Sequence, residues 1–263
     1  MSGIGIGLGI GLSRGGSSPP AWSPADLTPT FWLSAADISS LSTDSGGSTP
    51  VTATGDDVGR FADKSGNNRH FTGTGDTRPK YQATGIAGRP SVRWDDTDDV
   101  LSRTPTFCPS GAQTIALVFK LSSTPGAAEF DGLIDLSTGT RSTLFFVCNY
   151  AGYTPFCFAV DYSGSGAGIG FAWTPDTSPH TLLITYDGTG SHTASHYQAW
   201  LDGVPVTLST TGTFSLSSNC SIGNSGTGGF PLAGDLSELV ILPGVVAGAD
   251  LDELQAYLAA KIA

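Results

Sequence analysis

Short apolar runs that end at turn-forming residues constrain the fold of this chain more than any other feature. From Ala21 onward, runs rich in Val, Ile, Phe and Tyr alternate with Gly, Asn, Asp or Pro, and the dipeptides Asp187-Gly188 and Asp202-Gly203 favour tight turns. The clearest predicted strands are 114–121, 133–136, 144–149, 156–162, 180–186, 197–201, 221–222 and 235–242. Because no helical periodicity separates them, we predict an all-β chain folded as a two-sheet antiparallel sandwich.

The composition supports this prediction and excludes helical bundles and coiled coils. The chain has 36 Gly and 16 Pro but three Glu, four Lys and one Met, so residues that favour exposed helices are scarce. The glycine-rich stretch 164–168 lies between predicted strands and is interpreted as a flexible rim loop.

Residues 249–262 are the exception, because their pattern predicts one amphipathic helix. Leu251, Leu254, Leu258 and Ile262 share one helical face. The first turn carries acidic residues and Lys261 lies in the last turn, which matches the helix dipole. We expect this helix to pack on the sandwich as a structural cover.

The amino terminus has a different pattern. Gly alternates with five aliphatic residues, so that one side of an extended strand would be apolar and the other bare backbone; these residues are Ile4, Ile6, Leu8, Ile10 and Leu12. Such a strand needs a partner, so we predict an anchoring arm over 1–20, ending in a Ser/Pro linker, and a jelly-roll domain over 21–263. The alternative is a disordered leader. No Lys or Arg precedes the apolar run, so it does not read as a signal peptide.

Charge and cysteine content exclude several classes of protein. The net charge of −11, without a basic stripe, argues against binding of nucleic acid, and no apolar run is long enough to span a bilayer. Cys108, Cys148, Cys157 and Cys220 have no metal-site spacing. We expect buried thiols of a cytosolic chain, with Cys148 and Cys157 as the pair to bridge if a disulfide forms.

Several segments carry motifs that occur together in one family. The segment FWLSAAD at 31–37 is similar to the motif WLDAsD, and DKSGNN at 63–68 is similar to DkSGNg. GRPSVRWD at 88–95, YQAWLDG at 197–203 and the closing segments 236–242 and 251–261 follow in the family's order. Over about residues 27–262 the chain therefore resembles the laminin-G-like, concanavalin-A-like jelly-roll domains.

This resemblance implies a sandwich that serves in lectins, glycosidases and adhesion modules, so it does not by itself give a function. The Gly/Ile leader is similar to the amino termini of minor virion proteins in tailed bacteriophages. Together the two imply a non-enzymatic virion structural protein, a head or tail decoration, spike or fibre, made in the host cytoplasm. Its arm would bind other virion proteins in a symmetric homo-oligomer, and its lectin-like domain would bind host cell-surface polysaccharide.

Two alternatives stay open: a polysaccharide depolymerase on the same fold, and a secreted bacterial carbohydrate-binding or adhesion module. Laminarinase-like glycosidases place their acids in a pattern like ExDxxE. In EFDGLID at 129–135, Glu129 and Asp131 fit, but Ile134 takes the third position and Asp135 would point to the other face. We therefore expect no catalytic residues. A secreted module would need an export signal, which the leader does not resemble.

Two groups of residues are candidate binding sites. Aromatic and amide side chains of loop-rich segments could stack on sugars and bind hydroxyls: Tyr150, Tyr153, Tyr162, Trp173 and Asn224. Their alternative role is ordinary rim and core packing. Four carboxylates within one short stretch could bind Ca²⁺, the one cofactor considered: Asp95, Asp96, Asp98 and Asp99. The stretch lacks the Gly and terminal Glu of an EF-hand, so a solvated turn is the alternative.

Overall fold

The computed structural model describes residues 22–263 except 164–165, 191, 215, 217 and 226–228. The arm predicted over 1–20, with Ile4, Ile6, Leu8, Ile10 and Leu12, lies outside the described residues. Among the described residues, no helix has the length and hydropathy needed to cross a bilayer.

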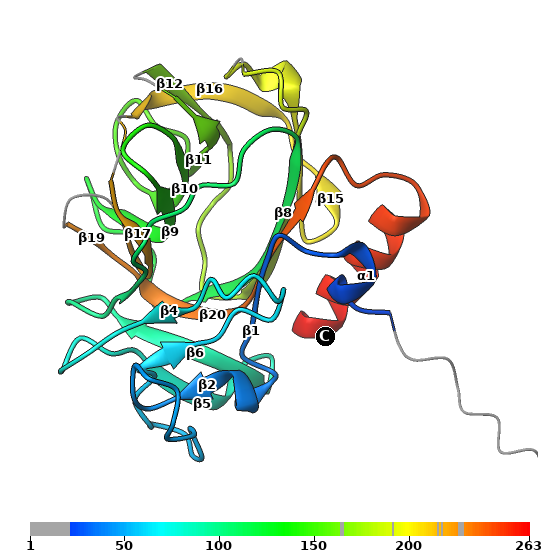
Figure 1. The fold of residues 1–263 in the computed structure, drawn as a ribbon. Helices are drawn as coiled ribbons and strands as arrows, with labels where there is room; N and C mark the ends of the chain where they lie inside the picture. Colours follow the sequence, from blue (N-terminus) through cyan, green and yellow to red (C-terminus); the bar gives the residue numbers. More distant parts are fainter. Residues whose placement is uncertain (1–21, 164–165, 191, 215, 217, 226–228) are drawn as a thin grey trace, which may run out of the picture.

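Two antiparallel sheets form the body of the molecule, as Figure 1 shows. Sheet A has eight strands. In spatial order they are β15 (Val204–Pro205), β14 (Tyr197–Leu201), β13 (Pro179–Tyr186), β8 (Gln113–Leu121), β20 (Ala233–Pro243), β6 (Arg89–Asp95) and β5 (Lys80–Ile86), and β1 (Phe31–Ser34) also pairs with β20.

Sheet B has ten strands, and a separate two-stranded hairpin lies beside it, in contact with β9. Its order is β16 (Leu208–Phe214), β12 (Gly166–Phe171), β11 (Phe156–Tyr162), β10 (Ser142–Cys148), β9 (Phe130–Ser137), β17 (Cys220–Ile222), β7 (Leu101–Ser102), β4 (Phe71–Thr72), β3 (Arg60–Phe61) and β2 (Leu41–Ser42). The hairpin pairs β18 (Asn224–Ser225) with β19 (Phe230–Pro231). Three short 3-10 helices complete the connections: Pro24–Leu27, Ile38–Ser40 and Ala194–His196.

The predicted all-β sandwich is confirmed, and each predicted strand corresponds to an observed one. The rim-loop interpretation of 164–168 is wrong for its described part, because β12 begins at Gly166 and pairs with both β11 and β16. Glycine is suited to this strand, since a Cβ at Gly168 would lie 1.9 Å from the ring of Phe214.

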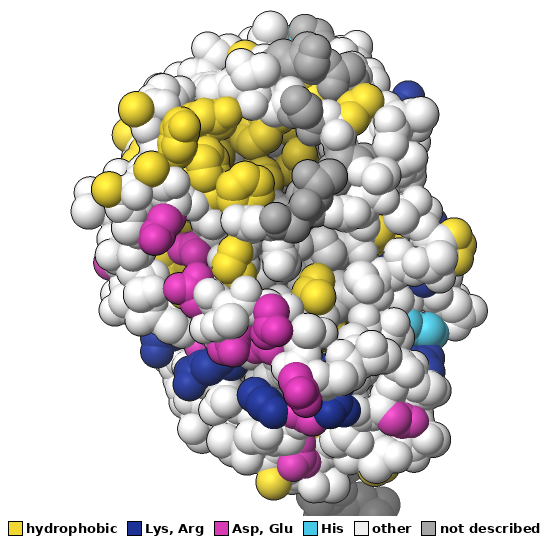
Figure 2. Space-filling model, turned by 90° about the vertical axis from the view of Figure 1, so that its left-hand side faces the viewer, with side chains coloured by type: hydrophobic (Ala, Val, Ile, Leu, Met, Phe, Trp, Pro, Cys, Tyr) yellow, Lys and Arg dark blue, Asp and Glu magenta, His cyan; other side chains and the backbone are white. Residues whose placement is uncertain are grey.

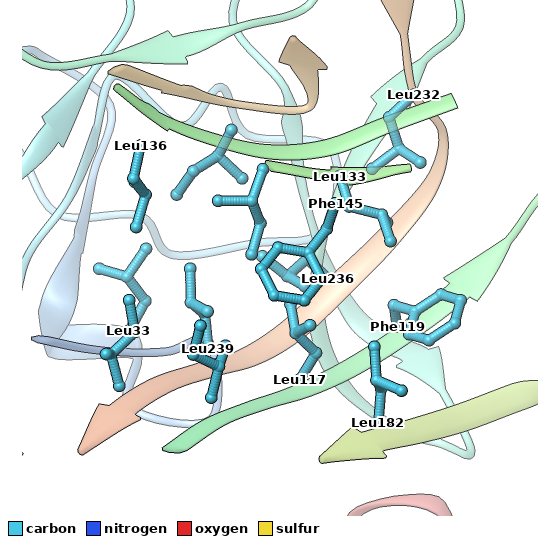
Figure 3. Packing of buried hydrophobic residues seen from close by; sticks show 14 of the residues in the cluster. Leu33, Leu117, Phe119, Leu133, Leu136, Phe145, Leu182, Leu232, Leu236 and Leu239 are labelled. Atoms are coloured by element: carbon cyan, nitrogen blue, oxygen red, sulfur yellow. The ribbon is translucent and has the colours of Figure 1, made fainter. Parts of the chain in front are cut away.

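The main core lies between the two sheets. Alternation along β10 sends Phe145 and Val147 into this core, while Leu144 and Phe146 face the outside of sheet B. Figure 3 shows Phe145 directed toward leucines of sheet A such as Leu117 and Leu236. The core draws residues from Phe31 to Ile241, so the described strands share one apolar interior.

The predicted helix is confirmed as α1 (Ala249–Ile262), which covers the outer face of sheet A beside β8 and β13. Leu254 and Leu258 are fully buried there, in a second cluster that includes Trp32. Beneath the helix, the buried carboxylate of Glu238 accepts hydrogen bonds from the ring N–H of Trp32, from Ser34 Oγ at 2.9 Å and from Tyr257 Oη at 2.7 Å. Lys261 adds an ion pair at 3.3 Å. The helix is therefore held by both apolar packing and a satisfied buried charge.

All four cysteines are free thiols. The Sγ atoms of Cys148 and Cys157 lie 3.6 Å apart on β10 and β11. Burial raises the pKa of the Cys108 thiol to about 12 and that of Cys220 to about 11, so neither is a reactive thiolate near neutral pH.

Candidate functional site

The outer face of sheet B carries a cluster of six aromatic rings, which we call the aromatic platform. Its members are Phe130 on β9, Phe146 on β10, Tyr150 and Tyr153 in the loop after β10, Phe214 on β16 and Phe230 on β19. Neighbouring ring centroids lie between 5.1 and 6.1 Å apart, which is the range of favourable aromatic contacts.

Part of the platform faces solvent. Tyr150 is 46% exposed and Phe230 is 37% exposed, and both contact the half-buried ring of Phe130. Figure 2 shows hydrophobic side chains gathered in a hollowed area on the side of the molecule where β9, β10 and β19 lie, with acidic side chains directly below. An exposed apolar area of this kind usually marks a binding surface.

Tyr153 is fixed within the platform by its backbone contacts. Its hydroxyl donates to Thr213 O at 2.8 Å and accepts from Thr213 N at 3.1 Å. Its ring lies over Gly212, where a Cβ would come within 1.8 Å of the ring. A glycine on β16 is therefore part of what shapes this surface, although glycine carries no binding group of its own.

An acidic pocket adjoins the platform. This cavity of about 310 Å³ is lined by Asp96, Ala128, Glu129, Phe130, Asp131, Gly229, Phe230 and Pro231. Phe130 and Phe230 belong to both features, so the pocket and the platform form one continuous surface. The described lining includes three carboxylates and no Lys, Arg or His.

Strand register explains how one short segment supplies both features. On β9, Phe130 pairs with Cys148, whose side chain lies in the outer cluster, whereas Asp131 pairs with Val147, whose side chain lies in the main core. Directly opposed side chains share a face, so Phe130 points outward and Asp131 points toward the gap between the sheets. Glu129 is held in the preceding turn, where its carboxylate accepts from the backbone N–H of Gly126.

Asp96 reaches the pocket from the other sheet. It follows β6 with a left-handed backbone, φ 67°, and its N–H donates to Leu232 O at 3.1 Å. The pocket therefore lies where an end of sheet A meets the beginning of β9 in sheet B.

The carboxylates of the pocket disfavour one another's charge. Asp131 is 5% exposed, and burial is the main cause that raises its pKa to about 7; the Ala233 N–H opposes this shift, and the charges of Asp96 and Glu129 add to it. Burial and the charges of Glu129 and Asp95 also raise the pKa of Asp96. Asp131 Oδ2 is buried without a hydrogen-bond partner. A group that supplies positive charge or donors here would relieve an existing cost.

The predicted sugar-binding residues are only partly brought together. Tyr150 and Tyr153 meet in the platform with ring centroids 5.8 Å apart. Tyr162 is buried, and its hydroxyl donates to Phe214 O at 3.2 Å. Trp173 packs against His180 and Phe119 on the main core, with ring centroids 4.9 and 6.2 Å away.

Asn224 lies on β18, opposite Pro231 in the hairpin that carries Phe230. It lines a separate cavity of about 330 Å³ beside Arg103 and Asn219. Phe130 and Phe230 were not predicted as binding residues, although Phe130 lies between Glu129 and Asp131 in the sequence.

The aspartates predicted for Ca²⁺ divide between two places. Carboxylate oxygens of Asp95, Asp98 and Asp99 lie within 4.8 Å of one another, a spacing that would suit a divalent cation. Burial and the charge of Asp95 raise the pKa of Asp99 to about 6. Asp96 lines the acidic pocket instead.

The structure separates the residues that were compared with the ExDxxE pattern. Glu129 and Asp131 line the same pocket, but Ile134 is buried in the main core. Asp135 pairs with Leu144 of the outer cluster, so it faces away from Asp131, and its carboxylate accepts from Ser137. The third acid of the glycosidase pattern is therefore missing from this pocket.

No protein-family model and no curated protein matches the chain. Solved structures match through their fold. The ligand-binding domain of botulinum neurotoxin serotype D, solved with N-acetylneuraminic acid, has a TM-score of 0.51 at 10% identity, covering 89% of this chain and 52% of that one. A structure of botulinum neurotoxin type C, from work on its interaction with two ganglioside molecules, has a TM-score of 0.50 at 11% identity, covering 90% and 53%.

A Ruminococcus gnavus sialidase CBM40 module bound to α2,3-sialyllactose covers 57% of this chain and 83% of its own at 18% identity, but its TM-score of 0.38 is too low to support an argument. This chain spans about half the length of the neurotoxin chains it matches. At these identities the likeness shows the fold alone. It agrees with the two-sheet sandwich of this chain.

Proposed function

We propose that this protein is a non-enzymatic glycan-binding protein and that the aromatic platform is its sugar-binding surface. The observation that carries the proposal is the exposure of Tyr150 and Phe230 within an aromatic cluster beside a pocket of carboxylates. Aromatic faces stack on the apolar faces of sugar rings, and carboxylates accept hydrogen bonds from hydroxyls. The shared fold with a neurotoxin domain solved with N-acetylneuraminic acid supports this choice.

A glycan array probed with the full chain tests the proposal. Glycans bound by the native protein are expected to bind Tyr150→Ala and Phe230→Ala variants about tenfold more weakly, because each change removes one stacking face. Val204→Ala is the matched control, since Val204 is 64% exposed on β15, outside the platform. Glycan binding that none of the platform changes alters would contradict this location, and an array without binding would contradict the function.

We propose further that the protein is a virion component whose residues 1–20 anchor it to other virion proteins. The support is the Gly/aliphatic alternation of the leader, which as an extended strand would present one apolar face that needs a partner. A particle-assembly assay comparing the full chain with a chain lacking 1–20 tests this role. Incorporation of the shortened chain would refute the anchor.

The depolymerase alternative is tested by an assay for polysaccharide cleavage at the acidic pocket. A glycosidase acting through Glu129 and Asp131 would cleave host polysaccharide and lose that activity in Glu129→Gln. We expect no cleavage products. The secreted adhesion module would instead show the same glycan binding without joining particles, so the two assays together separate it from the virion proposal.

Calcium binding by Asp95, Asp98 and Asp99 stays a prediction. Calorimetric titration of the full chain with CaCl₂ tests it, and an Asp98→Asn variant is expected to weaken the heat signal. Absence of heat at millimolar calcium would end the prediction.

A further inference from the structure

We infer that the acidic pocket binds a protonated amino group of the ligand, so that the glycan recognised is an amine-bearing sugar rather than an acidic one. This inference rests on the proposed function and adds the chemical class of the ligand. It is carried by the composition of the pocket wall, by the spacing of its carboxylates and by the continuity of pocket and platform.

The side chains of the pocket wall that carry charge are carboxylates. Asp96, Glu129 and Asp131 line the pocket, and its described lining contains no cationic side chain. Asp131 Oδ2 has no hydrogen-bond partner, although it is buried. A protonated amine supplies three donors and a positive charge, which satisfy such acceptors better than a neutral hydroxyl does.

Part of the pocket wall is aromatic. The ring centroids of Phe130 and Phe230 lie 5.1 Å apart and both side chains line the pocket, so a bound ammonium group would contact aromatic rings as well as carboxylates. Ring faces attract cations and repel anions. This wall would therefore oppose the carboxylate of a sialic acid twice, through the aspartates and through the rings.

The spacing of the pocket carboxylates favours an organic cation over a metal ion. Among the described residues, the group of carboxylates whose oxygens all lie within 4.8 Å is Asp95, Asp98 and Asp99, and not the set that lines the pocket. The pocket carboxylates are spread around a cavity of about 310 Å³, which is at the lower end for small-molecule sites. That volume fits the amino-bearing end of a sugar while the rest of the glycan lies on the platform.

Calorimetry with paired oligosaccharides tests the inference. The probes are β-1,4-linked glucosamine oligomers, the same oligomers N-acetylated, and sialyllactose, each titrated into the full chain. The free-amine oligomer is expected to bind at least about tenfold more tightly than its acetylated partner, with affinity that falls as NaCl is raised. Sialyllactose is expected to bind most weakly of the three.

Two variants locate the effect. Glu129→Gln alters an exposed pocket carboxylate, and Asp131→Asn alters the buried one without changing its shape. Both are expected to remove most of the preference for the free amine. Asp76→Asn is the matched control, because Asp76 is an exposed carboxylate outside the pocket. If Asp131→Asn does not fold, Glu129→Gln still decides the question.

The outcomes are distinguishable from those of the proposed function. Equal binding of free and acetylated oligomers, or array binding confined to other glycans, would overturn the amine inference and leave glycan binding intact. Oligolysine binding as tightly as the glucosamine oligomer would show that charge alone is recognised, and would also overturn it. Failure of every glycan to bind would overturn both.

Discussion

At the scale of single residues, Asp131 is a buried carboxyl group whose pKa is strongly raised. Its pKa of about 7 results first from burial and then from the carboxylates of Asp96 and Glu129; the thiol of Cys148 on the next strand also interacts with it electrostatically. Binding requires the charged form of Asp131 and the protonated form of the amine. In calorimetry at different pH values, the affinity for the free-amine ligand should therefore be greatest near neutral pH, and it should fall at lower pH as Asp131 gains a proton and at higher pH as the amine loses one.

The same shift predicts how Asp131→Asn changes stability with pH. The unfolded carboxyl releases its proton near 3.8 and the folded one near 7, so native stability falls as the pH rises between these values. Between about pH 4 and about pH 8, the free energy of unfolding of Asp131→Asn should therefore rise, relative to that of the native protein, by up to about 4 kcal/mol. Urea unfolding across this range measures it, with Asp76→Asn as the control at an exposed carboxylate.

Gly212 shows how a residue without a side chain can shape a binding surface. In Gly212→Ala the new Cβ would lie 1.8 Å from the Tyr153 ring, so the ring must move and its hydrogen bonds to Thr213 must break. We expect glycan affinity to fall as much as in Tyr153→Ala, with a stability loss of about 1–3 kcal/mol. Gly46→Ala is the control, since its Cβ would meet its nearest neighbour at an ordinary 3.5 Å. Unchanged affinity would show that Tyr153 does not contribute to binding.

At the scale of elements, the sequence predicted best where both faces of a strand are covered. β8 contains the unbroken apolar run 115–119 because the main core lies on one side and α1 on the other, so the sequence alone already indicates this strand. The helix was equally clear, because its period and its end charges agree. β12 was missed because its glycines fit under side chains of neighbouring strands, and such fitting depends on the partner rather than on the strand.

The site was less predictable than the fold for a related reason. Tyr150 and Tyr153 could be named because they stand in a loop, but Phe230 joins them from β19, far along the chain. Phe130 and Asp131 are adjacent in sequence and face opposite ways, but which of them faces outward is determined only by their pairing with Cys148 and Val147. Contacts that depend on strand register or on a hairpin distant in sequence produce no local sequence pattern, so they could not be predicted from the sequence.

Glu238 on β20 bonds to side chains of β1 and α1, so its removal tests how α1 is attached to sheet A. Glu238→Ala leaves the ring N–H of Trp32 and the hydroxyl of Tyr257 without their acceptor beneath the helix. We expect the free energy of unfolding to fall by about 3–5 kcal/mol, as for other buried ion pairs that lose one partner. Glu253→Ala is the control on the exposed side of the same helix. A loss no larger than the control's would mean that apolar packing alone holds α1.

At the scale of the whole molecule, the acidic pocket lies where both sheets contribute. Asp96 follows β6 of sheet A, whereas Glu129 precedes β9 of sheet B and Asp131 lies near its beginning, and one core joins the two sheets behind them. The net charge of −11 adds a long-range attraction for cationic ligands that salt will screen. A ligand seated in the pocket would thus contact both layers of the sandwich at once.

This placement predicts that ligand binding stabilises the entire fold and not a local segment. At a free-ligand concentration of about one hundred times Kd, linkage raises the free energy of unfolding by about 2.7 kcal/mol if the pocket and the core unfold together. Thermal unfolding followed by the aromatic signal should then show a higher Tm with the glucosamine oligomer, and Glu129→Gln should lose most of that rise. Binding that calorimetry detects without any rise in Tm would mean that the beginning of β9 and the β18–β19 hairpin open independently of the sandwich. In that case the two sheets would not act as one cooperative unit at the site.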